Sequence, residues 1–494
     1  MSAAGVPAAA LEYIPIGTRM AEIARAKPNA PAITSQDVTR TWGELHKRTN
    51  RMARGLLAKG VKLGDFVTIA LPNGNGFIET CYACWKIGAT PQPVSSKLPA
   101  NELVAIVELA NPPIVVSDTP MQSPRPVVSA RELYEASTDD SDLPEAIAPS
   151  LKAPTSGGST GRPKLIVSGS RGVTIKGGIE SSFYRYTPES TVLMPGPLYH
   201  NGPFGCTFGA LNIGAHVIVL PKFDAEETLR AVEKYKADWM YLVPTMMSRI
   251  WRLPTRETYD VSSLKTVWHL AAPCPPHLKE QWIHWLGGDA IMELYAGTEA
   301  QAVTVITGSE WLAHRGSVGR VMGGGVMAAF DAHGNQLPPG EIGEVYMKRN
   351  PDLPPSYRYI GAEARTLPGG WESLGDIGSF DEEGYLYLAD RRTDMILVGG
   401  ANVYPAEIEA ALDEHPLVAS SAVIGLPHEE LGNQVHAIIQ PREGLDLDDL
   451  QRHLAERLVI YKRPRTFELV EENVRDDAGK VRRTALRDAR VKKG

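Results

Sequence analysis

The sequence predicts an α/β protein with a large N-terminal domain of two similar α/β layers and a small α+β C-terminal domain. Short apolar strand patterns alternate with helical patterns between residues 30 and 120, and the same alternation returns between 190 and 300. This alternation is typical of parallel sheets covered by helices. A third observation, closely spaced turns between 315 and 390, indicates a small β-rich subdomain.

The first layer is predicted to contain a helix at 41–59 and a strand at 66–71. The run F-I-E-T-C-Y-A-C-W-K-I-G at 77–88 fits an amphipathic helix with a glycine at its end. Cys81 and Cys84 lie in this run, but no second Cys or His pair stands nearby at a spacing that suits a metal. We therefore expect both sulfurs to be small buried apolar groups.

Residues 117–153 are rich in Pro, Ser, Asp and Glu and have weak periodicity, which predicts a connection between the two layers. Strands of the second layer are expected at 215–220, 239–243 and 266–270, each next to a helical pattern. The turn sequences D-A-H-G-N, P-P-G and D-E-E-G then divide the β-rich stretch into short strands.

The C-terminal part has the pattern of a compact α+β domain. We expect a helix at 406–415, strands at 419–425 and 435–439, and a helix at 446–458. A basic run follows. Such a run is more often a solvated tail than a phosphate site, and we assign it no role. It contains Arg482, Arg483, Arg487, Arg490, Lys492 and Lys493.

The bulk properties exclude several classes of protein. With 494 residues, 43% of them hydrophobic, the chain can build sizeable cores in more than one domain. A formal net charge of -7 leaves no large basic field, so we expect no nucleic-acid partner. No uninterrupted run of 18 apolar residues predicts a membrane span, and the N-terminus lacks a secretory pattern, so a cytoplasmic location is expected. Four cysteines are too few for a disulfide scaffold and should be reduced thiols.

The run S-G-G-S-T-G-R-P-K at 156–164 has the composition of a phosphate-binding loop. Its glycines let the backbone approach an anion, its hydroxyls donate hydrogen bonds, and its lysine brings positive charge. It is not a Walker loop, because Pro163 stands between the last glycine and the lysine. The candidate phosphate-binding residues are Ser156, Gly157, Gly158, Ser159, Thr160, Gly161 and Lys164.

Four further segments follow this loop in a fixed order. They are Y-A-G-T-E at 295–299, L-G-D-I-G at 374–378, the run 390–409, and A-G-K at 478–480. Together with the loop, they resemble the adenylate-forming superfamily, which includes acyl-CoA synthetases, the adenylation domains of peptide synthetases, and luciferases. The resemblance extends from about residue 15 to residue 487.

The resemblance implies that the protein activates a carboxylic acid with ATP, in a reaction where two anions must meet. Preorganised donors, Mg²⁺ and a lysine suit that chemistry. The loop would hold the β- and γ-phosphates and then the pyrophosphate. In the family, the residues that match Tyr295, Thr298 and Glu299 stack on adenine, meet the α-phosphate and hold Mg²⁺, respectively.

The resemblance also implies the nucleoside contacts. Asp376 matches an acidic residue that grips both ribose hydroxyls, and a carboxylate can accept two hydrogen bonds from a vicinal diol. Arg391 matches an arginine that also meets the ribose. The segment Ala271, Ala272 and Pro273 resembles the one that lines the adenine.

Two residues are implied at the reacting carboxylate. His200, in P-L-Y-H-N-G, matches a position at the mouth of the acyl pocket. It is not expected to act as a general base, because a carboxylic acid is already ionised at neutral pH. Lys480 matches the C-terminal catalytic lysine that bridges the carboxylate and the α-phosphate, a role for which a point charge is well suited.

The resemblance divides the chain into an N-terminal adenylation domain, 1–392, and a C-terminal domain, 393–494, that swings between two orientations. The hinge position is often Asp or Lys in the family, but here it is Thr393, a departure that bears on the geometry of the second half-reaction. Gly399 and Gly400 match the loop that faces the site in the second orientation.

Five large apolar residues lie in segments that border the acyl pocket by resemblance, so we expect an aromatic or bulky apolar acid. The alternative is that they are core residues. They are Phe204, Phe208, Trp239, Met240 and Trp268.

Three hypotheses compete for the second half of the reaction. In an acid–CoA ligase, the CoA thiol takes the acyl group from acyl-AMP, and this is our leading interpretation because no carrier domain is fused to the chain. In a stand-alone amide bond synthetase, a free amine takes it. A catalytically inactive nucleotide-binding protein would have lost charged site residues, and the motifs keep Glu299, Asp376, Arg391 and Lys480.

Overall fold

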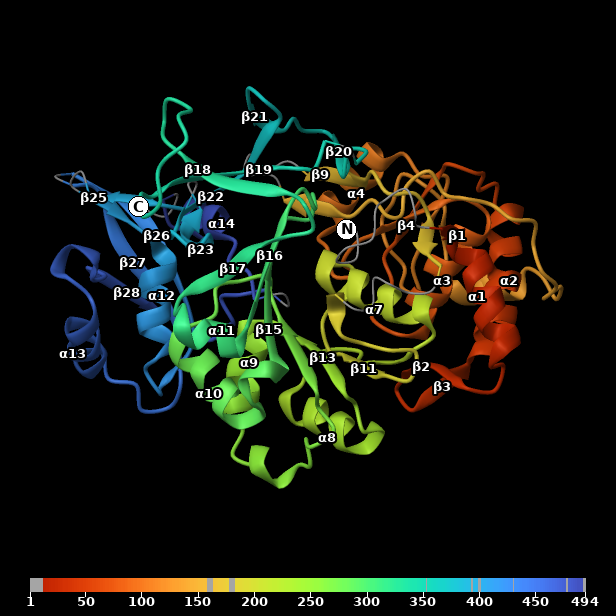
Figure 1. Ribbon diagram of the computed structural model, residues 1–494, viewed down its shortest axis with the longest axis horizontal. Coiled ribbons are helices and arrows are strands. Elements are labelled where there is room, and N and C mark those ends of the chain that lie inside the picture. Colours follow the sequence, from red (N-terminus) through yellow and green to blue (C-terminus); the bar gives the residue numbers. More distant parts are fainter. Residues whose placement is uncertain are drawn as a thin grey trace.

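Figure 1 shows a computed structural model of the chain. The structure describes residues 12–157, 163–176, 183–351, 353–391, 394–398, 401–429, 431–476 and 479–491. Within these ranges, no helix is both long enough and apolar enough to span a membrane.

The first layer is a parallel sheet with the strand order β5-β4-β6-β7. Helix α2 begins at a capping box in which the side chains of Thr41 and Glu44 each accept a hydrogen bond from the other's backbone N–H. Cys81 and Cys84 lie in α3 and are 0% exposed, which confirms the helix and the burial of both sulfurs. The helix is not amphipathic as predicted, because every residue from 77 to 86 is buried. The strands are β4 (Phe66–Ile69), β5 (Thr90–Pro93), β6 (Val115–Val116) and β7 (Val127–Val128); the helices are α1 (Ile16–Ala26), α2 (Trp42–Ala58), α3 (Asn75–Lys86), α4 (Ala100–Ala110) and α5 (Ala130–Glu135).

The second layer is the parallel part of a sheet that has fourteen strands in the described ranges. Strands β2, β12, β11, β13, β14 and β15 lie side by side and run in the same direction. The strands are β2 (Pro31–Ser35), β3 (Val38–Thr41), β11 (Thr191–Met194), β12 (His216–Val219), β13 (Trp239–Leu242), β14 (Thr266–His269) and β15 (Ile291–Tyr295); the helices are α7 (Asn201–Ile213), α8 (Ala225–Tyr235), α9 (Pro244–Trp251), α10 (Pro276–Leu286) and α11 (Gly308–Ala313). The two predicted α/β layers are therefore both present.

The short strands expected in the β-rich stretch are present. They are antiparallel, and they continue the large sheet through β16, β17 and β23 instead of forming a sheet of their own. Its strands are β16 (Val303–Thr307), β17 (Ser317–Met322), β18 (Val326–Phe330), β19 (Gly343–Lys348), β21 (Arg365–Leu367), β22 (Trp371–Phe380) and β23 (Tyr385–Arg391). The large N-terminal part also has two small antiparallel sheets. One pairs β1 (Tyr13–Pro15) with β10 (Val173–Ile175), and the other joins β8 (Thr155–Gly157), β9 (Pro163–Ser168) and β20 (Tyr357–Ile360).

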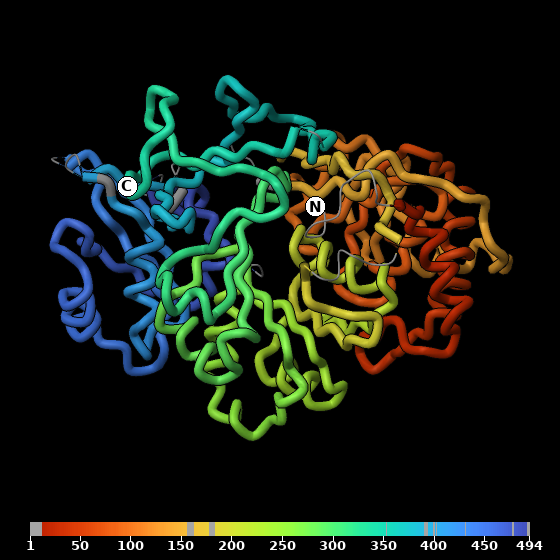
Figure 2. The backbone as a smooth tube through the Cα atoms, in the orientation of Figure 1, coloured from red at the N-terminus to blue at the C-terminus, as the bar shows by residue number. Residues whose placement is uncertain are grey.

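The C-terminal part, blue in Figures 1 and 2, has its own sheet and its own hydrophobic core around Val403, Leu412 and Leu450. Its elements are β24 (Ile396–Val398), β25 (Ala401–Val403), α12 (Pro405–Asp413), β26 (Val418–His428), β27 (Gly432–Pro441), α13 (Leu447–Arg457), β28 (Thr466–Leu469) and α14 (Arg483–Val491). The α+β prediction is confirmed. The predicted domain boundary falls on residues 392 and 393, outside the described ranges, and stays a prediction.

Part of the basic run that the sequence left without a role is helical. Residues 483–491 form helix α14, and two of its arginines bind carboxylates instead of pointing to water. Arg483 pairs with Glu409, and Arg490 pairs with Glu468 at 2.5 and 2.8 Å. The many charged residues of this segment hid its helical pattern in the sequence. An arginine can bury its aliphatic stem while its guanidinium binds a carboxylate, so a charged residue can still face the protein.

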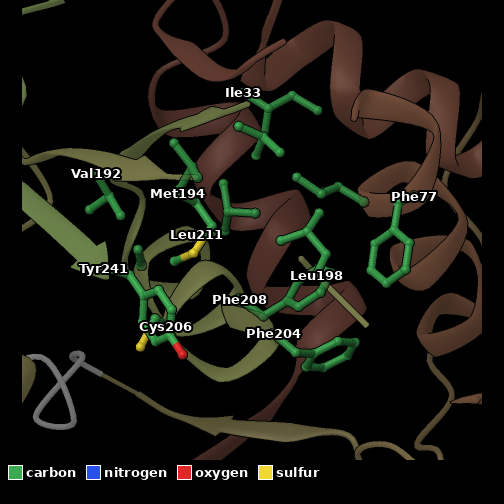
Figure 3. Packing of buried hydrophobic residues seen from close by; sticks show 14 of the residues in the cluster. Ile33, Phe77, Val192, Met194, Leu198, Phe204, Cys206, Phe208, Leu211 and Tyr241 are labelled. Carbon is green, nitrogen blue, oxygen red and sulfur yellow. The ribbon is translucent and has the colours of Figure 1, made fainter. Parts of the chain in front are cut away.

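The main core lies between the two layers, where α7 packs on α3. Figure 3 shows that Phe204 and Phe208 of α7 lie toward Phe77 of α3. On another side of α7, Cys206 lies beside Tyr241 of β13. The rings of Phe204 and Phe208 are 4.5 Å apart and both contact Trp85 of α3 edge-on. This packing fixes the N-terminus of α7 at the edge of the parallel sheet.

A buried ion pair supports the end of β15. The side chain of Lys279, on α10, is 1% exposed and its amine donates to Glu293 Oε2 on β15. His269 Nε2 lies 3.9 Å from the same carboxylate, but burial lowers the pKa of His269 to about 4, so this ring is neutral at pH 7. Lys279 is therefore the cation that balances Glu293.

We predict that Lys279→Met lowers the free energy of unfolding of the large N-terminal part by about 3–5 kcal/mol, because it leaves Glu293 charged and buried. Chemical denaturation followed by tryptophan fluorescence measures this. Adding Glu293→Leu should recover most of the loss. As a control, Lys236→Met removes an exposed pair with Asp260 and should leave the midpoint nearly unchanged. Equal losses in the two single variants would contradict the role given to Lys279.

Candidate functional site

The site forms at the carboxyl edge of the parallel strands, where the residues at the ends of four strands emerge. Because β11, β13, β14 and β15 are parallel, the residues that follow them emerge on the same side of the sheet. His200 follows β11, Thr245 follows β13, Ala271 follows β14, and Tyr295 ends β15. Sequence motifs far apart in the chain are brought together in this way.

The side chain of Glu299 is buried at this edge, and the residue is 6% exposed. Tyr359 Oη donates to its Oε1 atom at 2.5 Å, and Lys164 Nζ lies 3.6 Å from the same oxygen. The Lys164 amine also lies 3.9 Å from the centre of the Tyr359 ring. Burial and the charge of Glu299 raise the pKa of Tyr359 far above its usual range, so this hydroxyl keeps its proton. The structure thus joins the lysine of the phosphate-binding motif to the predicted metal ligand.

The phosphate-binding motif lies on the β8–β9 hairpin, in which Gly157 is opposite Pro163 and Ser156 is opposite Lys164. The calls for Gly158, Ser159, Thr160 and Gly161 fall on residues 158–162, outside the described ranges. Of Ser156 and Gly157, only the backbone is described.

The predicted ribose ligand, Asp376, is 8% exposed and lies in β22. It accepts a hydrogen bond of 2.6 Å from the hydroxyl of Tyr295, the predicted adenine platform. The backbone of Arg391, in β23, is directly opposite Asp376 in the antiparallel register. Three of the predicted nucleoside-binding residues therefore come from adjoining positions.

The remaining nucleoside segment and Thr298 are accessible. Ala271 and Pro273 are exposed, while Ala272 and Thr298 are partly exposed. Ala271 has a φ of 79°, a left-handed conformation that costs a non-glycine residue roughly 1–2 kcal/mol. Such strain is typical of functional loops that the surrounding structure holds in place.

His200 is the N-cap of α7, and its ring lies 4.3 Å from that of Tyr199. The first turn of α7 holds no acidic residue, so the positive end of the helix dipole faces this loop without a local carboxylate. The loop is fixed by Asn73, which accepts from Leu198 N at 2.8 Å and donates to Gly196 O at 2.8 Å. The sequence reasoning missed Asn73, since an asparagine that supports a loop leaves no motif.

The segment that carries Lys480 packs against the large domain. Gly479 has a φ of 75°, and a β-carbon there would lie 2.9 Å from Thr245 Oγ1 on α9. Asp476 closes the turn: its carboxylate accepts from Lys480 N at 2.9 Å, and its own N–H donates to Lys480 O at 2.9 Å. A cleft of about 180 Å³ lies here, lined by Tyr199 and Thr245 on one side and by Asn473 and Asp476 on the other. The Lys480 side chain is exposed.

Two arginines anchor this segment on either side of Lys480. Arg475 and Arg483 both donate to the carboxylate of Glu409, at 3.0 Å and at 2.7 and 2.8 Å. Glu409 is 4% exposed and also accepts from Val423 N. A buried carboxylate with two guanidinium partners holds a fixed geometry.

Mg²⁺ fits the donors at this site only with help from a nucleotide. In the described ranges, no three or more His, Cys, Asp or Glu side chains gather as a metal cluster. Mg²⁺ is commonly held by one or two carboxylates together with substrate phosphates and water, which suits Glu299 as a single protein ligand.

The five apolar residues predicted near the acyl group are all 3% exposed or less and belong to the main core. The indole N–H groups of Trp239 and Trp268 both donate to Tyr184 O, at 2.6 and 3.0 Å. These contacts favour the core alternative for both tryptophans. Thr393, Gly399 and Gly400 lie outside the described ranges.

Two family models match the chain: "AMP-binding enzyme" over residues 20–353, and "AMP-binding enzyme C-terminal domain" over residues 407–480. A feruloyl-CoA synthase from Amycolatopsis is 31% identical over 479 residues, covering 94% of this chain and 96% of that protein. An indoleacetate–CoA ligase from Aromatoleum aromaticum is 29% identical, with 94% and 96% covered. The o-succinylbenzoate CoA synthetase of Bacillus subtilis, solved with its acyl-adenylate intermediate, superposes with a TM-score of 0.82 at 24% identity, covering 97% of this chain and 99% of that one.

We predict that Gly479→Ala slows the adenylation expected from the sequence by at least about tenfold, because a displacement of about 1 Å at a reacting group can cost about 10²-fold. Acid-dependent exchange of pyrophosphate into ATP measures the effect. Gly444→Ala is the matched control: its φ is 85°, but no atom lies within 4 Å of its added β-carbon. If both variants lose activity equally, backbone strain and not contact with Thr245 is responsible.

Proposed function

The chain belongs to the AMP-binding enzyme family, and from this premise we propose that it is an AMP-forming acid–CoA ligase. One carboxylate oxygen of the acid attacks the α-phosphorus of ATP, the bond to the β-phosphate oxygen breaks, and pyrophosphate leaves. The CoA thiol then attacks the acyl carbon and AMP leaves with the oxygen that joined it to the acid. The alternative, transfer to an amine, lacks support among the relatives reported above, which are named as CoA ligases.

The observation that carries this proposal is the contact between Gly479 and Thr245. It brings the Lys480 segment to the edge of the sheet where His200 and Tyr295 emerge. There, Lys480 would neutralise charge as the carboxylate approaches the α-phosphate.

The other residues take the roles expected from the family. Lys164 would bind phosphate oxygens, and its contact with Glu299 would be exchanged for them when ATP enters. Tyr295 would stack on adenine, while Asp376 and Arg391 would hold the ribose. Mg²⁺, when bound with the nucleotide, supplies charge neutralisation at the phosphates. Thr298 would meet the α-phosphate and His200 the acid.

We infer that the acid is aromatic or bulky and apolar, which is supported by relatives named for feruloyl and indoleacetate substrates. We also infer a cytoplasmic location, where ATP and CoA are supplied. The four cysteines, all free, are compatible with it.

Mass spectrometry of products tests the proposal. Purified protein is supplied with ATP, Mg²⁺, a panel of aryl and alkyl acids, CoA and a simple amine. We expect acyl-CoA, AMP and pyrophosphate in equal amounts from at least one acid. Formation of amide while CoA remains unconsumed, or of ADP in place of AMP, would contradict the proposal.

A further inference from the structure

Three glycines of α7 lie close together around the helix. Gly202, Gly205 and Gly209 fall within about 60° of one another around the helix, because each residue turns it by about 100°. A β-carbon on Gly202 would lie 2.9 Å from Tyr241 Oη, and one on Gly209 would lie 2.2 Å from Tyr186 Oη. A β-carbon on Gly205 would meet no atom within 4 Å. The two tyrosine hydroxyls therefore close on the helix backbone at either end of an open space at Gly205.

Lys152 borders this space. Its Nζ atom lies 5.0 Å from the centre of the Phe204 ring, and its charge lowers the pKa of the Cys206 thiol, against the larger effect of burial. Phe204 and Cys206 stand on either side of Gly205 around the helix. The opposite arc between them is filled by residues that are 0% exposed, namely Thr207, Ala210 and Leu211. The partly buried Lys152 side chain therefore reaches α7 on its glycine face.

The amine of Lys152 has no anionic partner in the described part of the chain. Burial lowers its pKa to about 8, so it still carries a proton at pH 7 much of the time. Burial also raises the pKa of the Cys206 thiol to about 12, so this sulfur is neutral and cannot balance the charge. The contact with Phe204 offsets only part of the cost of removing an ammonium from water.

The two lysines that are most deeply buried among the described residues are satisfied by the protein itself. The amine of Lys86 is bonded to Asn50 Oδ1 and to His46 Nδ1, and the amine of Lys279 is bonded to Glu293. Lys152 differs from both, because the groups around it are an aromatic ring, a neutral thiol and an open space.

We propose that Lys152 selects acids that carry an oxygen acceptor, phenolic or carboxylate, at the end remote from the reacting carboxylate. This inference rests on the proposed function, in which His200 marks the carboxylate end of the pocket. Gly205 is five residues further along α7, which is about 7.5 Å along the axis. That rise matches one aromatic ring with its carboxyl group, so a ring lying along the glycine face presents its far substituent to Lys152.

Matched acids test this selectivity. The probes are 4-hydroxybenzoic, 4-carboxybenzoic and 4-methylbenzoic acid, which differ only in the remote group. We expect kcat/KM for at least one oxygen-bearing acid to exceed that for the methyl acid by about tenfold or more. In Lys152→Met, this ratio should fall to about twofold, mainly through the oxygen-bearing acid. Which of the two oxygen groups is preferred identifies the source of the acceptor.

A matched control is Lys176→Met, which removes an exposed lysine paired with Glu12 and should keep the wild-type ratio. A wild-type enzyme without preference, or a Lys152→Met variant that retains it, would overturn the inference. Activation of acids without preference overturns this inference alone, whereas failure of every acid to form acyl-AMP would overturn the proposed function with it.

The open space at Gly205 has a test of its own. Gly205→Val fills it without striking a neighbouring atom at the β-carbon, so we expect the variant to fold. The ratio of kcat/KM for 4-hydroxybenzoic acid to that for propionic acid should fall by about tenfold or more, because only the ring needs this space. An unchanged ratio would show that the acid does not lie along the glycine face.

Discussion

The common direction of strands β11, β13, β14 and β15 is the constraint on which the site depends. Parallel strands present all their carboxyl ends at one edge, so the chain returns to the same place after each crossover. His200, Ala271 and Tyr295 therefore emerge at the same edge although they are far apart in the sequence. The Lys279–Glu293 ion pair lies beneath this edge and holds β15 against α10. Catalytic groups on loops are thus held by a rigid sheet.

The C-terminal part contributes the cation Lys480 to the edge of the large sheet. Glu409 fixes the turn around Lys480 because two arginines converge on its buried carboxylate. Removing one partner of such a buried ion pair leaves an unbalanced buried charge and strongly lowers the free energy of unfolding. The geometry of the turn is therefore coupled to the stability of the domain. Arg475 also donates to Gly479 O at 3.3 Å, which connects the anchor to the contact with Thr245.

Local pattern and motif order made most of this structure predictable from sequence. The helix that carries Cys81 and Cys84 was evident from its apolar run and its terminal glycine, and the C-terminal elements from their apolar patterns. What the sequence could not reveal depends on tertiary contact. Helix α14 was missed because its arginines bind carboxylates 22 to 89 positions away. Tyr359 and Asn73 act through hydrogen bonds to residues far away in the chain, and such contacts leave no local signal.

Acyl-AMP is the central claim, and oxygen-18 in the carboxylate tests it most directly. When acid labelled at both carboxyl oxygens is converted with ATP and CoA, one labelled oxygen should appear in AMP and the other in the thioester carbonyl. That result follows only if the carboxylate attacks the α-phosphorus and AMP leaves from the acyl carbon. Label in inorganic phosphate, or unlabelled AMP beside labelled product, would contradict the account.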